Sequence, residues 1–235
     1  MTELHLLCAG AAQGLVKALQ AQFEAQTGAT LQARFGAVGA MKEALLAGEP
    51  CDVMIVTEAM IDALAADGRL QADTRASLGR VRTGIAVQAG APHPDVATPD
   101  ALRAALLAST AIYFPDAVRS TAGIHFARVM QELGILDTLQ PRFCTYPAGA
   151  IAMRELAAAQ GPGLIGCTQL TEIKYTPGVE LVAALPTQFE LATAYSAAAA
   201  AGLQSPAQAA LAQRFIALVS GVGSLALRSA GGFEF

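Results

Sequence analysis

The chain has 235 residues, which fits one large domain or two small lobes, and 54% of them are hydrophobic while 14% are charged, so we expect a compact protein with a sizeable core. Its formal net charge of −4 and the absence of a Lys/Arg cluster exclude the basic stripe that a nucleic-acid-binding surface needs. No apolar run reaches the roughly 20 residues that cross a membrane, so we expect no membrane span.

The cysteines and the N-terminus give two further expectations. Cys8, Cys51, Cys144 and Cys167 lie far apart without the paired spacing of a zinc site, so we expect buried free thiols, no metal and no cofactor. Residues 1–7 lack the basic start and long apolar segment of a secretory signal. This predicts a cytoplasmic protein, and the alternative is a periplasmic protein in its mature form.

The first part of the chain repeats one unit, in which a strand is followed by a turn of small residues and then by a helix. Three such units in succession predict a parallel sheet, with the turns near Gly10, Gly36 and Thr57 at the carboxyl ends of its strands. Ligands of open α/β sheets bind at that edge. The expected strands are 4–9, 30–35 and 51–56, and the expected helices are 15–27, 41–46 and 59–66.

The remaining chain continues the alternation and returns to its starting lobe. We place the first crossing between two lobes near Thr83 and expect a return strand at 189–196, which predicts lobe I at 1–82 plus 192–235 and lobe II at 83–191. Further strands are expected at 81–88, 111–115, 141–146, 164–169 and 179–184, and further helices at 101–107, from 121 to about 133, from 149 to about 157, at 171–173 and at 206–219, with a short one before 231.

A small-hydroxyl run, Ser120-Thr121-Ala122-Gly123, lies between the strand that ends at Pro115 and a helix-patterned segment. Backbone N–H groups at a helix start lack partners within the helix, and the positive end of the helix dipole suits a carboxylate or an oxyanion. Ser and Thr are also ordinary N-cap residues of helices that bind nothing. This stretch alone therefore leaves anion binding and simple capping open.

Several motifs together resemble the type II solute-binding proteins of ABC importers, most closely the molybdate-binding branch, over nearly the full chain. That resemblance implies an α/β fold of two lobes, each with a mostly parallel sheet flanked by helices, joined by two crossover strands around an interlobe cleft. It also implies a small anionic ligand and an ABC transporter permease as partner. The motifs that carry it are residues 9–12, 35–39, 50–55 and 121–124, followed by a helix from Pro206 and by 228–233.

The same resemblance implies a set of ligand contacts at the turns that follow the strands, and the strand ends themselves add Thr57 and Gln169. The predicted contacts are Gly10, Ala11, Gly36, Val38, Gly39, Thr57, Ser120, Thr121, Ala122, Gly123, Gly149, Thr168 and Gln169.

The chain departs from the molybdate-binding pattern at three places. The first two turns, around Gly10 and around 36–39, offer no serine hydroxyl, and the tyrosine of the last contact segment is replaced by 166–169. Losing three side-chain donors would leave oxyanion oxygens unsatisfied at about 1–3 kcal/mol each. We therefore expect a larger organic anion in place of molybdate. Residues 120–128 and 168–173 are similar to those of a sub-branch that resembles aconitate isomerase.

Two functions follow, with a third ranked below them. The first is a solute-binding protein of an ABC transporter. The second is a cofactor-independent isomerase of a small carboxylic acid, in which His125 is the candidate base and Arg82, Arg119 and Glu58 lie near strand ends. The other interpretation of His125 is a histidine packed on a helix face. The third function is a cytoplasmic sensor domain, although the chain carries no DNA-binding module.

Overall fold

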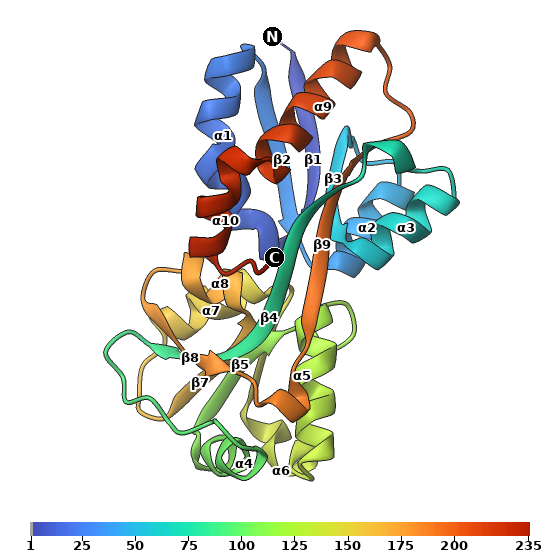
Figure 1. Cartoon of the computed structure of the whole chain (residues 1–235). Coiled ribbons are helices and arrows are strands. Elements are labelled where there is room, and N and C mark those ends of the chain that lie inside the picture. Colours follow the sequence, from blue (N-terminus) through green and yellow to red (C-terminus); the bar gives the residue numbers. More distant parts are fainter. Residues whose placement is uncertain (1) are drawn as a thin grey trace. The chain divides into compact units, whose positions relative to one another are not determined.

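The computed structural model describes residues 2–235, which form two compact units (Figure 1). Unit 1 contains the described residues up to Arg80 together with Thr193–Phe235, and unit 2 is Val81–Ala192. The chain enters unit 2 within β4 (Ala76–Gln88), the strand that contains the predicted crossing at Thr83, and it leaves at the start of β9 (Ala192–Ala199). Two strands therefore carry the chain between the units, as the predicted fold requires.

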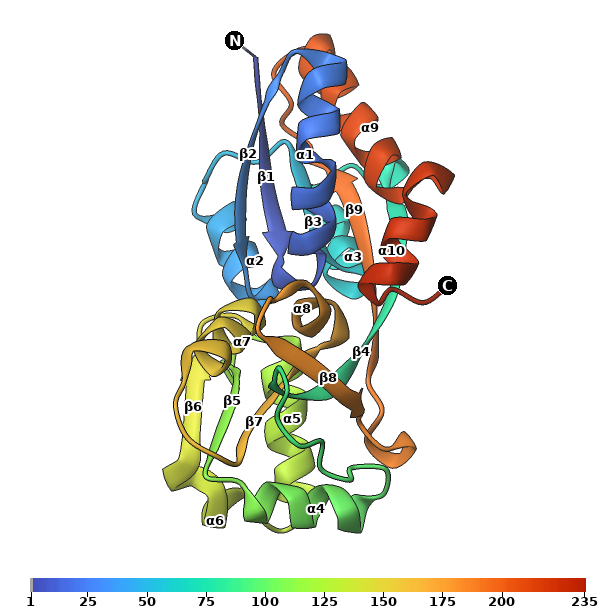
Figure 2. The ribbon, with the colours of Figure 1, turned by 90° about the vertical axis from the view of Figure 1, so that its left-hand side faces the viewer.

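Unit 1 has a mixed sheet in the order β2-β1-β3-β9. β1 (Glu3–Ala9) pairs in parallel with β2 (Thr30–Gly36) and with β3 (Val53–Thr57), whereas β9 runs antiparallel to β3. Figures 1 and 2 show α1, α9 and α10 on one face of this sheet and α2 and α3 on the other. The helices are α1 (Gln13–Thr27), α2 (Val38–Leu46), α3 (Glu58–Ala66), α9 (Pro206–Ser220) and α10 (Leu225–Gly231).

The packing of α1 shows why the first predicted unit forms. Its buried side chains recur at helical spacing, and one of them, Phe23, meets Phe215 of α9 edge-to-face with ring centroids 5.1 Å apart. The helix ends at Gly28, whose φ of 69° is left-handed, so its N–H turns back to the carbonyl of Glu24. The apolar face of α1 thereby covers a sheet that is buried along nearly the whole of β1.

Unit 2 has a second mixed sheet, in the order β4-β7-β5-β6, with β8 paired to β4. β5 is parallel to both β6 and β7, and β4 is antiparallel to β7 and β8. The strands are β5 (Ala111–Pro115), β6 (Phe143–Tyr146), β7 (Leu164–Gln169) and β8 (Val179–Ala184). The helices are α4 (Pro99–Ala108), α5 (Thr121–Glu132), α6 (Leu136–Leu139), α7 (Gly149–Ala158) and α8 (Leu170–Tyr175).

Most element bounds shift by one or two residues from the sequence-based prediction, and β4 begins at Ala76 in place of residue 81. Three further differences have a local structural cause. α2 begins at Val38, three residues before the predicted start, because Ala37 is its extended N-cap and Val38 and Gly39 form its first turn. The short helix α6 was not predicted; it follows Gly134, whose φ of 67° ends the preceding helical run. The return strand begins at Ala192, since 187–189 form a 3-10 turn.

The cysteines are free thiols; Cys8 and Cys167 are buried, whereas Cys51 and Cys144 are partly exposed. Burial raises the pKa of the Cys8 and Cys167 thiols, and it raises that of Cys51 to about 12. Thiols that stay protonated in this way are poor nucleophiles and poor metal ligands.

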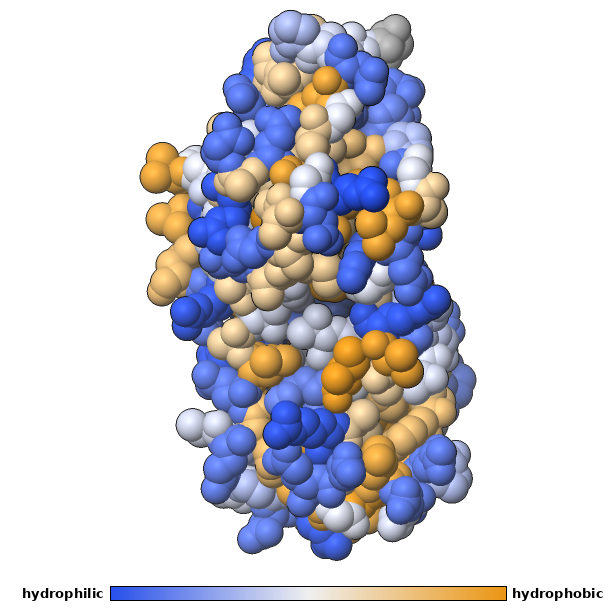
Figure 3. Space-filling model, turned by 90° about the vertical axis from the view of Figure 1, so that its right-hand side faces the viewer, coloured by the Kyte–Doolittle hydropathy of each residue, from blue (hydrophilic) through white to orange (hydrophobic). Residues whose placement is uncertain are grey.

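Among residues 2–235, no single helix is long and apolar enough to span a membrane. α9 and Val222–Gly231 reach the required length and apolar composition only when taken together, and this pair is bent by 46°. On the face shown in Figure 3, hydrophobic residues form separate groups among hydrophilic ones. Exposed large hydrophobic side chains include Val118, Ile124 and Val222.

Candidate functional site

The predicted contacts of unit 2 lie at the carboxyl ends of three adjacent strands. β5 lies between β6 and β7, with Pro115 opposite Tyr146 and Tyr113 opposite Gly166, and all three strands run parallel. The turn before α5, the start of α7 and the end of β7 therefore lie at one edge of the sheet. This edge gathers Ser120, Thr121, Ala122, Gly123, Gly149, Thr168 and Gln169.

The predicted contacts of unit 1 are arranged in the same way around its own sheet. β1 lies between β2 and β3, and each of these parallel strands leads directly into a helical turn. Gly10 and Ala11 form a buried 3-10 turn after β1, Val38 and Gly39 begin α2 after Gly36, and Thr57 is the N-cap of α3. Each unit thus brings its own predicted contacts together at a carboxyl edge.

The turn before α5 is fixed by Asp116 and opens into a helix packed tightly on the strand end. The carboxylate of Asp116 accepts hydrogen bonds from the N–H groups of Val118 (2.7 Å) and Arg119 (3.0 Å). Ser120 is the N-cap, and its hydroxyl accepts from Gly123 N at 3.5 Å. Thr121 and Ala122 supply N–H groups that have no acceptor within the helix. The local structure combines capping with donors suited to an anion.

A buried carboxylate, Glu172, lies at the start of α7. One of its oxygens accepts from Ala150 N at 3.2 Å, the other accepts from the hydroxyl of Thr168, and the backbone of Gln169 adds a further hydrogen bond. Only 7% of Glu172 is exposed. Desolvation raises the pKa of the Glu172 carboxyl, and the three hydrogen bonds oppose this shift in part.

Glu172 therefore faces two of the predicted ligand contacts. A Cβ atom on Gly149 would lie 2.0 Å from both the Glu172 carboxylate and the Thr168 hydroxyl, so only glycine fits at this helix start. Gln169, a third predicted contact, is 2% exposed, and its amide nitrogen donates to the backbone oxygens of Val81 (3.1 Å) and Arg82 (3.2 Å). Donors predicted to meet a ligand thus have partners within unit 2.

His125 lies in the first half of α5, is half-buried, and has its Nε2 atom 2.7 Å from the carbonyl oxygen of Phe189. That contact fixes the ring and uses one of its two nitrogens. The other ionisable candidates are also paired, because Arg82 lies 3.7 Å from Glu190, and Glu58 lies 3.0 Å from Arg75. Among residues 2–235 no group of three or more His, Cys, Asp and Glu side chains has the arrangement of a metal site.

Sequence reasoning missed Glu172 as a site residue, and it also missed several buried hydroxyls. Glu172 was assigned only to a brief helix, although a carboxylate within the otherwise uncharged stretch 164–173 was a signal of a buried, hydrogen-bonded acid. Within residues 2–235, the hydroxyls of Thr83, Thr171, Thr193 and Ser196 are buried without a hydrogen-bond partner. Ser196 pairs with Val56, one position before Thr57 at the carboxyl end of β3.

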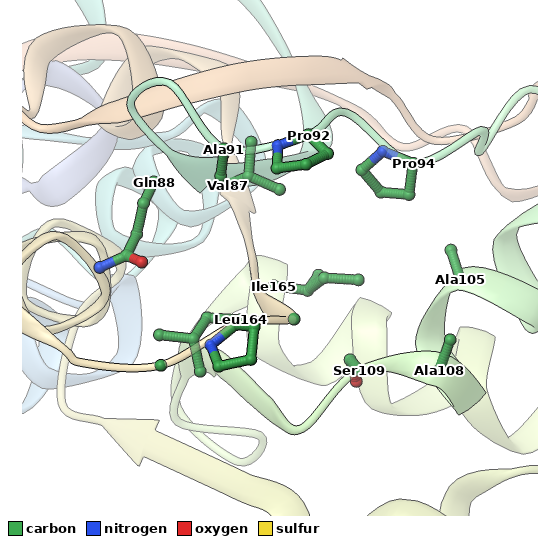
Figure 4. A pocket seen from close by; sticks show the side chains of 13 residues that line it. Val87, Gln88, Ala91, Pro92, Pro94, Ala105, Ala108, Ser109, Leu164 and Ile165 are labelled. Carbon is green, nitrogen blue, oxygen red and sulfur yellow. The ribbon is translucent and has the colours of Figure 1, made fainter.

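A cavity of about 290 Å³ lies elsewhere in unit 2, between the end of β4, the start of β7 and the end of α4 (Figure 4). Its lining is mostly apolar, as Val87, Pro92 and Ile165 illustrate. The polar side chains have partners already: Gln88 donates to the carbonyls of Leu156 and Ala159, and Ser109 donates to that of Leu106. The cavity contains none of the predicted contacts and offers an anion no free donor side chain.

Comparison with known proteins agrees with the geometry. A family described as bacterial extracellular solute-binding protein matches residues 4–233. Aconitate isomerase from Pseudomonas sp is 28% identical over 223 residues, which cover 92% of this chain and 83% of that one. The periplasmic molybdate-binding protein of Azotobacter vinelandii has a similar structure, with a TM-score of 0.79, 19% identity and 99% of each chain covered.

A third similar protein was solved with an organic anion. PEB3, from Campylobacter jejuni, has a structure with L-phospholactate bound, which matches with a TM-score of 0.69, 16% identity and 99% of each chain covered. At these identities the structural similarities show the fold. The family match, which covers nearly the whole chain, shows that this protein belongs to the bacterial extracellular solute-binding proteins.

Proposed function

We propose that this protein binds a small organic anion at the carboxyl edges of its parallel strands and acts as a solute-binding protein. The observation that carries the proposal is the collection of helix starts at one edge of each unit, three in each. Helix starts present backbone N–H groups and a positive dipole end, which favour negative charge. Solute binding is also the activity for which the family is named.

The chemistry of the turns favours an organic acid over a small oxyanion. The turns at Gly10 and at 36–39 offer backbone groups and no hydroxyl, and the Thr168 hydroxyl already donates to Glu172. A tetrahedral oxyanion needs many donors in a dry site, because each unsatisfied oxygen costs free energy. An organic acid needs donors at its carboxylates only, and PEB3 illustrates that this fold accepts a phosphorylated organic acid.

Isothermal titration calorimetry tests the proposal directly. We expect saturable binding of at least one of citrate, cis-aconitate, malate or phospholactate, and weaker binding of molybdate and sulfate. A matched series with each neutral amide or ester analogue separates anion recognition from general affinity for the carbon skeleton. Tighter binding of molybdate than of every organic acid would contradict the organic-anion proposal, and an absence of heat with every anion would contradict anion binding altogether.

Transport would require a partner and a location. We propose an ABC transporter permease as the partner, and a site of action outside the cytoplasmic membrane, in agreement with the family's description. Fractionation of cells that express the native gene, followed by crosslinking with the ligand present, tests both points. Recovery of the protein in the cytoplasm alone would contradict a role in import and would favour the second function.

The second function is isomerisation of a small carboxylic acid, favoured by the 28% identity to aconitate isomerase across 92% of the chain. In this reaction a base removes a proton from a carbon next to the double bond, the double bond moves, and the proton returns at a neighbouring carbon. Helix-start N–H groups would stabilise the negative charge that develops on the carboxylate. Two candidate bases among the ionisable groups of unit 2 are His125 and the buried Glu172.

Incubation with cis-aconitate in D2O, followed by NMR, tests this function. We expect signals of the trans isomer together with deuterium in the substrate. His125→Gln and Glu172→Gln identify the base, because only loss of the base abolishes deuterium incorporation, while Glu155→Gln removes an exposed carboxylate from α7 as a control. The absence of both isomerisation and deuterium incorporation would contradict the function for this substrate.

A further inference from the structure

Glu172 occupies the position that an external anion takes at the start of a helix. Its carboxylate accepts from Ala150 N at 3.2 Å, in the first turn of α7, and from the Thr168 hydroxyl at the end of β7. These are the kinds of donor, a helix-start N–H and a nearby hydroxyl, that the sequence predicted for the ligand. The protein therefore supplies its own anion at this point.

The space at this helix start is already full. The 2.0 Å separations from an ideal Gly149 Cβ to the Glu172 carboxylate and to the Thr168 hydroxyl leave no room for even one additional carbon. A ligand oxygen reaches these two donors only if the Glu172 side chain moves away. Glu172 also has a structural anchor, because its backbone carbonyl accepts from the Thr176 hydroxyl at 2.7 Å, which holds α8 in place.

The Glu172 carboxylate lies at the helix start next to the start of α5, where the remaining N–H donors of unit 2 are found. The start of α7 follows β6 and the start of α5 follows β5, and these strands are adjacent and parallel, with Asp116 N bonded to the carbonyl of Tyr146. A ligand at the start of α5 thus lies beside the end of β6, and the start of α7, which follows β6, is occupied by the Glu172 carboxylate. Like charges at short range oppose binding, most strongly for a compact dianion.

We propose that Glu172 is a selectivity-determining residue that excludes small inorganic oxyanions and leaves the α5 start of unit 2 for the carboxylate of an organic acid. This inference rests on the proposed anion-binding function. It specifies that small inorganic oxyanions are rejected and that Glu172 rejects them. A compact oxyanion cannot accept hydrogen bonds from Ala150 and Thr168, because both already donate to Glu172, and the negative charge of Glu172 repels it. An organic acid holds its charges apart and keeps its uncharged part near Glu172.

The test compares the parent protein with Glu172→Gln, which keeps the shape and hydrogen-bonding capacity of the side chain and removes its charge. Sodium molybdate and citrate are titrated calorimetrically into both at pH 8, where the Glu172 carboxyl, whose pKa is raised, carries more of its charge than at lower pH. We expect Glu172→Gln to bind molybdate at least about tenfold more tightly than the parent, because a like charge is removed, while citrate changes by less than about threefold. Glu155→Gln, which removes an exposed charge from α7, the helix whose start Glu172 contacts, should change neither.

A second measurement follows the Ala150 amide by NMR. In the parent this amide should be insensitive to molybdate, and in Glu172→Ala, which frees the Ala150 N–H and the Thr168 hydroxyl, it should shift. If Glu172→Gln does not fold, Glu172→Met supplies a neutral side chain of similar length, and the parent amide remains a test by itself, since a large molybdate-induced shift there would overturn the proposal.

The outcomes separate this inference from the proposed function. A parent that binds citrate, with a folded Glu172→Gln that gains no molybdate affinity, overturns the role of Glu172 alone. A parent that binds no anion, with a variant that binds molybdate, supports the role of Glu172 and contradicts the organic-anion proposal. If neither protein binds any anion, both proposals are overturned.

Discussion

The backbone N–H of Ala150 donates to the carboxylate of Glu172 across 3.2 Å, and this bond joins the first turn of α7 to α8. The two helices follow different strands, β6 and β7, which are separated by β5. A carboxyl side chain of α8 therefore caps the start of α7, where a ligand was expected to bind. Because the bond is intramolecular, its consequences appear in stability as well as in binding.

The first prediction is that Glu172 makes the stability of the protein fall as pH rises. Its folded pKa is raised, so the folded state keeps a proton that the unfolded chain, with a pKa of about 4.3, has already lost. The stabilising contribution of this proton is complete below the unfolded pKa and is lost as pH rises through the folded pKa. Each unit by which the pKa is raised corresponds to about 1.4 kcal/mol.

Urea unfolding of the parent and of Glu172→Gln between pH 4 and pH 8 measures this effect. The difference in unfolding free energy between the two proteins should move in favour of the variant as pH rises, while contributions from other carboxylates cancel in the comparison. Glu155→Gln provides the control for the removal of an exposed carboxylate. A difference between parent and Glu172→Gln that does not change over this range would show that the carboxyl titrates alike in the folded and unfolded chains.

A second prediction concerns Gly123 in the first turn of α5. Replacing a glycine within a helix by alanine ordinarily stabilises by about 1 kcal/mol. Here an ideal Cβ would lie 2.3 Å from the carbonyl oxygens of Pro115 and Asp116, and backbone atoms at a strand end move little. Gly123→Ala should therefore destabilise by about 2 kcal/mol or more.

Gly202→Ala is the matched control, because its Cβ meets nothing within 4 Å and it lies outside the strands and helices. Its unfolding free energy should differ from that of the parent by less than about 0.5 kcal/mol. Equal stabilities for Gly123→Ala and Gly202→Ala would mean that α5 does not pack as closely on β5 as the structure shows.

The repeated strand, small turn and helix could be predicted from the sequence because each step has a local cause. Apolar residues at helical spacing, such as Leu15 and Leu19, and uninterrupted apolar runs such as Val53–Thr57 are recognised without tertiary information. The start of α2 at Val38 was harder, because a first turn rich in Gly and Ala has the composition of a loop. Local preference there is weak, and packing decides where the helix begins.

The candidate site could be predicted only as far as the strand ends. Parallel strands bring their carboxyl ends to one edge whatever the side chains are, so the positions of Ser120 and Gly149 follow from topology. The partner of Ala150 does not, because Glu172 is 22 residues away and reaches it only after β7 and α8 have formed. The contact between His125 and Phe189, 64 residues apart, has the same long-range origin.

A third prediction concerns Ser196, whose hydroxyl is buried in β9 without a hydrogen-bond partner among residues 2–235. Its exposed fraction is 1%, so removing the hydroxyl breaks no hydrogen bond to the described residues and leaves one buried polar group fewer. Ser196→Ala should therefore leave the unfolding free energy unchanged or raise it by up to about 1–2 kcal/mol.

Ser224→Ala is the contrasting variant. The Ser224 hydroxyl is equally buried, donates to the carbonyls of Val219 (3.0 Å) and Gly221 (2.9 Å), and accepts from Arg228 Nε (3.1 Å). Its loss should destabilise by about 1–3 kcal/mol. A comparable loss for Ser196→Ala would indicate an ordered water bound to the Ser196 hydroxyl.

The final prediction concerns Thr121, the first residue of α5. The Thr168 hydroxyl donates to Glu172 and the Gln169 amide donates to the backbone of unit 2. This leaves the hydroxyl of Ser120, whose oxygen caps the helix, and that of Thr121 as side-chain donors among the predicted contacts of unit 2. Thr121→Val keeps the shape and should weaken organic-acid binding about tenfold to a hundredfold, the value of one hydrogen bond to a charged group. It should weaken binding more than Val38→Ala, which keeps the backbone donors of the α2 turn. Thr138→Val, an exposed change in α6, is the control for hydroxyl loss. Calorimetric affinities for citrate measure all three variants, and an affinity of Thr121→Val equal to that of the parent would exclude a direct contact between this hydroxyl and the ligand.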